Sequence, residues 1–242
     1  MAQQLIVPGL NGPLSQLVYE ESSHVYKTLI DDKELDDEDE RLKEHLSALF
    51  LMIDKYNLLD LLCIHSAHSH FPLPEGTVLY GVDGKSPICR RTKPTPIKNI
   101  VDEHVHGHIF VVVNSKLQAY EFQEGDAPDF SCHNLDQFLE EYIDFVEVQK
   151  LDKLAGLQMR YGNFESSEMW ECFEGNESIM MDASAAKLRG YKPGRETGWV
   201  GTKENGHIRY SANGGSPLCG TVSIIHKSSS PVARINASGR TA

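Results

Sequence analysis

The sequence predicts an α+β fold: N-terminal helices followed by a mainly antiparallel sheet, with one long helix inserted between the strands. Three observations predict it. Apolar residues recur at helical spacing through the first 62 residues. From about residue 72, short β-branched and aromatic runs alternate with turn signals. Alternating βα units are not visible, which counts against a doubly wound sheet and leaves a closed or half-closed barrel as one form of the antiparallel sheet.

Two helices are expected in the N-terminal part, separated by the acidic stretch 31–40. The acids precede the second helix, where carboxylates suit the helix dipole. The oxygen-ligand spacing and the glycine of a calcium loop are missing, so we expect a solvated helix entry there. The apolar positions of the first helix are Leu14, Leu17, Val18, Val25 and Leu29. Those of the second helix are Leu42, Leu46, Leu49, Phe50 and Ile53.

Hairpin signals dominate the sheet-rich part. Runs 77–82 and 88–91 flank the Asp83-Gly84 turn, and a second hairpin is expected over 104–113 and 117–122. A helix should start after Asn134 and continue to about Leu154, followed by Gly156. Further short strands are expected at 157–161, 197–202, 207–211 and 221–226.

Composition bounds the class of protein. The 242 residues are 40% hydrophobic with a formal net charge of -12. We expect one globular domain over 1–226, helical in 1–62 and sheet-rich in 72–226, with a flexible tail over 227–242. The charge argues against nucleic acid and anionic membranes as partners, and a homo-oligomer is compatible with the sequence. The N-terminus lacks the pattern of a secretory signal, so the expected location is the cytoplasm.

Histidine is concentrated in two clusters, His65-Ser-Ala-His68-Ser-His70 and His104-Val-His106-Gly-His108, which hold six of the 11 histidines. Imidazole is the commonest protein ligand for transition metals and the usual proton carrier near neutral pH. No Cys-x-x-Cys pair occurs among the five cysteines, so a zinc ribbon is not indicated. His-Glu-x-x-His and His-x-Asp/Glu motifs are absent as well. The clusters therefore predict a site without naming a reaction.

Strand geometry limits how many histidines of the later cluster can share one ion. Side chains two apart on a strand share a face, with Cα atoms about 6.6 Å apart, so two of the three can meet one metal. A third would need a bulge, for which Gly107 is the natural place. His106 and His108 are the expected first ligands, with His68 or His70 completing the coordination sphere. His68 and His70 share a face if their segment is extended; His65 and His68 do if it is helical.

Other side chains are candidates for acid–base or binding roles. We expect Glu103 and His104 to move protons and Arg160 to face the same interior. The stretch 187–199 is either a solvated loop or a substrate lid whose Arg189, Lys192 or Arg195 grips an anion.

These features predict an intracellular metal-dependent enzyme, an oxidoreductase or a lyase, acting on a small organic molecule. Oxygenase-type chemistry is slightly favoured, with Fe(II) as the first choice and Zn(II) or Cu as alternatives. Two other hypotheses remain open. One is a metal-free isomerase, cyclase or dehydratase that uses histidine acid–base catalysis, and the other is a non-catalytic metal-binding protein.

Overall fold

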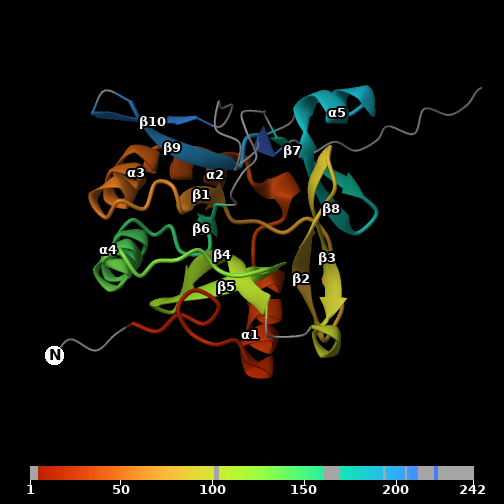
Figure 1. Cartoon of the computed structure of the whole chain (residues 1–242), viewed down its shortest axis with the longest axis horizontal. Coiled ribbons are helices and arrows are strands. Elements are labelled where there is room, and N and C mark those ends of the chain that lie inside the picture. Colours follow the sequence, from red (N-terminus) through yellow and green to blue (C-terminus); the bar gives the residue numbers. More distant parts are fainter. Residues whose placement is uncertain are drawn as a thin grey trace, which may run out of the picture.

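The computed structural model describes residues 5–100, 104–160, 169–192, 195–204, 206–211 and 221–222, and it combines helices with one large mixed sheet (Figure 1). The helices are α1 (Gln16–Lys27), η1 (Asp32–Glu34), α2 (Asp36–Lys43), α3 (Leu46–Lys55), η2 (Ile97–Asn99), α4 (Leu135–Val148) and α5 (Ala183–Leu188). The strands are β1 (Leu62–Ser66), β2 (Thr77–Asp83), β3 (Ile88–Pro96), β4 (Val105–Val113), β5 (Lys116–Glu124), β6 (Ala155–Met159), β7 (Met169–Glu174), β8 (Glu177–Asp182), β9 (Gly198–Glu204), β10 (His207–Ser211) and β11 (Thr221–Val222).

The strands follow the order β10-β9-β1-β6-β4-β5-β2-β3-β8-β7-β11. Antiparallel pairing dominates; β2 with β5 and β7 with β11 are the parallel pairs. The sheet is not closed, so the α+β class holds in its coarse form and the barrel-like form is not confirmed. Six strands separate β1 from β7 in this order, yet His70, which follows β1, lies 3.6 Å from Glu171 of β7 (Nε2 to Oε1). The sheet therefore curves until side chains from distant strands face each other.

Two apolar clusters hold this curved sheet. The larger one packs α3 and α4 against the sheet through side chains such as Phe50, Phe138 and Trp199. The smaller one joins Tyr26 of α1 to Ile109 and other side chains of β2, β4 and β5. Ile109 also lines the polar cavity described below, so the smaller cluster forms its apolar floor.

The two predicted hairpins are confirmed as β2–β3 and β4–β5. β1 was not predicted, because its five residues are buried on both faces and carry no alternation. β7 and β8 were missed although Gly175-Asn176 is a hairpin signal: Gly175 has a φ of 65°, and Glu174 pairs with Glu177 across the turn. α4 ends at Val148 rather than near Leu154. The expected tail over 227–242 lies outside the described residues.

No helix in the described part of the chain has the length and apolar character needed to cross a membrane.

Candidate metal centre

Three ligand-type side chains meet between the N-terminal helices and the sheet: Asp32, His68 and His70. Each offers one ligand atom, and the three atoms lie within 4.8 Å of one another. Among the described residues this is the one group of three or more histidine, cysteine or carboxylate side chains close enough to share an ion. Asp32 is 5% exposed and His68 is 2% exposed, so the group sits in the interior.

A backbone bridge brings these distant residues together. Asp31 and Ser69 form an isolated parallel bridge, in which Asp32 N donates to Ser69 O (2.9 Å) and Ser69 N donates to Ile30 O (2.8 Å). Ser69 lies between the two histidines in sequence, so the bridge places the Asp32 side chain beside both of them.

His68 is held in the tautomer that a metal ligand requires. Its Nδ1 lies 2.6 Å from Ser66 O, and a carbonyl can only accept, so Nδ1 carries the proton. Nε2 therefore keeps its lone pair. That buried atom has no hydrogen-bond partner among the described residues. A ring fixed through one nitrogen and open at the other is the usual arrangement of a metal-binding histidine.

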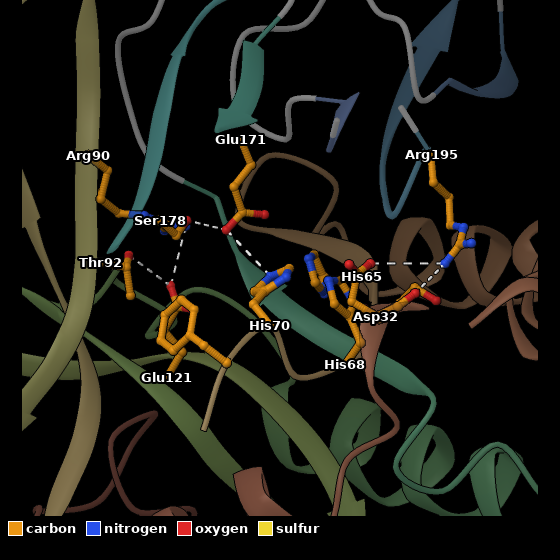
Figure 2. A network of polar contacts seen from close by, with 12 residues as sticks. Asp32, His65, His68, His70, Arg90, Thr92, Glu121, Glu171, Ser178 and Arg195 are labelled. Atoms are coloured by element: carbon orange, nitrogen blue, oxygen red, sulfur yellow. Dashed lines mark hydrogen bonds and ion pairs between the residues drawn. The ribbon is translucent and has the colours of Figure 1, made fainter. Parts of the chain in front are cut away.

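The His70 ring has Glu171 as its neighbour on the side away from Asp32 and His68. Its Nε2 lies 3.6 Å from Glu171 Oε1, and Glu171 accepts a hydrogen bond from the Ser178 hydroxyl. Figure 2 shows the His70 ring between Glu171 and the group of Asp32 and His68. The Tyr26 hydroxyl fixes the backbone at this point, because it accepts a hydrogen bond from His70 N (3.0 Å) and donates one to Phe71 O. His70 Nδ1 is buried and has no hydrogen-bond partner in the described part of the chain.

Asp32 completes the group. Arg195 donates to the Asp32 carbonyl at 2.7 Å, but its guanidinium is 4.0 Å from Asp32 Oδ1. Oδ1 is buried and makes no hydrogen bond to any described residue. Burial raises the pKa of Asp32 to about 6, although Arg195 opposes the rise. Burial also lowers the pKa of His68 and of His70 to about 3, so both rings are neutral at neutral pH.

The donor set fits a first-row transition metal. A buried polar atom left without a partner costs roughly 1–3 kcal/mol, so such atoms are rare and need an explanation. Here each residue of the group has one: two imidazole nitrogens and one carboxylate oxygen. Imidazole suits iron, zinc and copper, and a 2-His-1-carboxylate set is typical of non-haem Fe(II), whereas calcium and magnesium prefer oxygen ligands.

A polar cavity of about 20 Å³ adjoins the group. A water molecule needs about 10–15 Å³ of such space, and organic ligands occupy pockets of roughly 300–1,000 Å³. The cavity is therefore of the size of one water molecule or a slightly larger molecule. Its lining consists of His65, His68, His70, Leu79, Arg90, Ile109, Tyr120, Glu121, Gln158, Glu171 and Met180.

A buried ion pair forms one wall of the cavity. Arg90 Nη2 of β3 lies 3.3 Å from Glu121 Oε1 of β5, and burial raises the pKa of Glu121 to about 7. β2 runs between these two strands, and its Gly81 makes the contact possible. A Cβ at Gly81 would lie 3.2 Å from Arg90 Cδ and would clash with Gln123 Oε1. The missing side chain lets Arg90 cross over β2.

The later histidine cluster, from which we expected two ligands, lies outside this group. Two strand spacings separate β4 from β1, roughly 10 Å. The pairing of β4 with β5 shifts register between Gly107 and Ile109, so the expected bulge is present, but it turns His108 toward Arg90 and Gln158. His108 Nε2 thus faces two nitrogen donors. His106 Nδ1 lies 2.8 Å from Gly125 O. Neither histidine belongs to the three-ligand group, in which Asp32 takes the place we expected His106 to fill.

The other predicted site residues lie apart from this group. Glu103 is outside the described residues. His104 is 75% exposed and lies 3.3 Å from Asp126 (Nδ1 to Oδ1). The Arg160 guanidinium, which follows β6, donates a hydrogen bond to the Leu59 carbonyl, so this side chain contacts the backbone of a neighbouring segment. Of the 187–199 stretch, Arg195 reaches the site, and it contacts Asp32.

Sequence reasoning missed two residues of the site. Asp32 was included in the acidic run expected to be solvated, and no spacing rule links it to histidines that lie some 36 positions later. Glu171 lies on a strand that was not predicted. For the earlier cluster the extended alternative is the correct one, since His65 lies on β1 and the His68 and His70 ring centroids are 4.3 Å apart.

Comparison of this chain with protein-family models, with curated proteins and with solved structures found no match.

Proposed function

We propose that this chain is a metal-dependent enzyme, an oxidoreductase or a lyase, that holds one divalent ion on Asp32, His68 and His70. The observation that carries the proposal is a group of two histidines and one carboxylate whose ligand atoms lie within 4.8 Å of one another. Each of the three residues also has a buried nitrogen or oxygen without a hydrogen-bond partner among the described residues. Fe(II) is the first choice for this donor set, with Zn(II) and Cu as alternatives.

When bound, such an ion activates dioxygen or polarises an oxygen of a substrate. The chain's own residues prepare the site. Ser66 O fixes the His68 ring, and Glu171 orients the His70 ring. The cavity wall adds proton-handling side chains, among them Glu121 and His65, close to the ion position.

Anaerobic calorimetric titration of the full chain with Fe(II) and with Zn(II) tests the proposal. We expect one tight site per chain, lost in Asp32→Ala and in His68→Ala. The matched control is His106→Ala, which lies outside the group and should keep the site. Loss of binding in the control with retention in both site variants would contradict the ligand assignment.

The same titration separates the two other hypotheses. A metal-free acid–base enzyme predicts no tight site for either ion. A non-catalytic metal-binding protein with separate surface sites predicts weak, multiple binding that His104→Ala reduces, because His104 is the exposed member of its cluster.

A further inference from the structure

The cavity beside the three-ligand group is small, and polar and apolar side chains share its wall. Eight of its lining residues are buried, and the partly exposed ones are His70, Arg90 and Met180. Among the described residues, these three are therefore the part of the lining that reaches solvent.

Met180 differs from the other two partly exposed lining residues. His70 is a member of the ligand group, and Arg90 is paired with Glu121. Met180 lies on β8 and is registered directly opposite Arg90 of β3 and Glu171 of β7, so the three residues occupy one line across the sheet. Its side chain is apolar, unbranched and flexible, a type that fills gaps without taking part in polar contacts.

Resting on the proposed function, we infer that the ion site admits a molecule of about two or three heavy atoms, such as dioxygen or water, and that Met180 sets this size limit. The cavity volume of about 20 Å³ accepts such a molecule. An organic substrate of ordinary size needs more than ten times that volume, so it does not enter this cavity while Met180 is in place. Polar walls on His65 and Glu121, with an apolar floor on Ile109, suit a small molecule that accepts or exchanges protons.

The test uses the full chain loaded with Co(II), whose visible absorption reports on changes at the metal. Azide is the small probe and imidazole the large one. We expect azide to change the spectrum of the wild-type protein and imidazole to leave it unchanged. In Met180→Ala, imidazole should change the spectrum at concentrations about tenfold or more below the highest that leaves the wild type unchanged. Met180→Val, which introduces a smaller, β-branched side chain suited to a strand, should give the same result more weakly.

Met181→Ala is the matched control. Met181 is the next residue on β8, fully buried on the opposite face among Trp170 and Cys172. Its truncation weakens the core without enlarging the cavity, so imidazole should still leave the spectrum unchanged. Equal responses of the wild type to azide and imidazole would overturn the size limit, and so would a Co(II) protein that responds to neither. An unchanged imidazole response in folded Met180→Ala and Met180→Val would remove Met180 from the role. If Co(II) fails to bind at one per chain, the proposed function itself fails before any probe is added.

Discussion

Replacing Asp32 by Asn should change the stability of the metal-free and the metal-loaded protein in opposite directions. In the metal-free protein, the interior opposes the Asp32 charge, because burial raises its pKa from 3.8 to about 6 even with Arg195 nearby. One pKa unit corresponds to about 1.4 kcal/mol, so the buried charge costs roughly 3 kcal/mol at pH 7.5. Asn has a similar shape and no charge. We therefore expect Asp32→Asn to raise the free energy of unfolding by up to about 3 kcal/mol when metal is removed.

The pH dependence of this gain follows from the same shift. The folded pKa of Asp32 lies above the unfolded value, so the folded state binds more protons between the two, and the cost of the charge appears as pH rises. The gain of the Asn variant should therefore be complete above about pH 6 and should disappear as pH falls toward 3.8.

Metal should reverse the order of the two proteins. An ion at about 1,000 times its dissociation constant stabilises the folded state by about 4.1 kcal/mol, which exceeds the cost of roughly 3 kcal/mol for the buried charge. Asp32→Asn loses a charged ligand, so it should gain far less from the same ion concentration. The assay is urea unfolding at pH 7.5 with chelator and with Zn(II). Asp31→Asn is the control, because Asp31 is an exposed neighbour that caps η1 through Lys33 N and should keep the metal response. A less stable Asp32→Asn in chelator, or an undiminished response to Zn(II), would refute the reasoning.

Three further predictions concern a glycine that packs closely, a buried carboxyl and a buried thiol. Gly81→Ala should lower the free energy of unfolding by about 1–3 kcal/mol in urea titrations, because its Cβ would displace the buried Gln123 amide and crowd Thr92 Oγ1 (3.1 Å) and Arg90 Cδ (3.2 Å); an unchanged midpoint would contradict this. The Glu121 carboxyl should titrate near pH 7 in ¹³C NMR spectra, because burial raises its pKa to about 7 from 4.5, and a midpoint near 4.5 would show that the carboxyl is solvated. Glu121→Gln should therefore gain stability relative to wild type as pH rises through this range. Burial raises the pKa of Cys172 to about 12, so Cys172→Ser should leave the fast phase of thiol labelling at pH 8 unchanged, whereas Cys132→Ser, at an exposed position, should reduce it.

Short-range sequence patterns predicted a hairpin turn and a β-bulge, because a few neighbouring residues determine each of them. The Asp83-Gly84 turn marks the first hairpin, because Asp-Gly suits the tight connections that match strand twist. Gly107 marks the bulge in β4, where a register shift is found. Strands such as β1, buried on both faces, carry no period that separates them from a buried helix.

The site depends on contacts that no local pattern encodes. His68 and His70 were expected as ligands from their spacing, and both belong to the ligand group. Asp32 reaches them through a backbone bridge between residues 31 and 69, a contact set by tertiary structure. Glu171 reaches His70 because the sheet curves, which depends on the whole strand order. The number of histidines in the later cluster does not show which way each one points. His108 of that cluster faces Arg90 and Gln158.

Elemental analysis of the untagged, purified full chain measures whether the three-ligand group holds an ion. We expect close to one first-row transition metal per chain in the wild-type protein. The metal should be lost in His70→Ala and retained in His104→Ala, since His70 belongs to the ligand group and His104 is exposed. Wild-type protein without metal, and unable to take up one ion per chain on reconstitution, would show that the group is not a metal site.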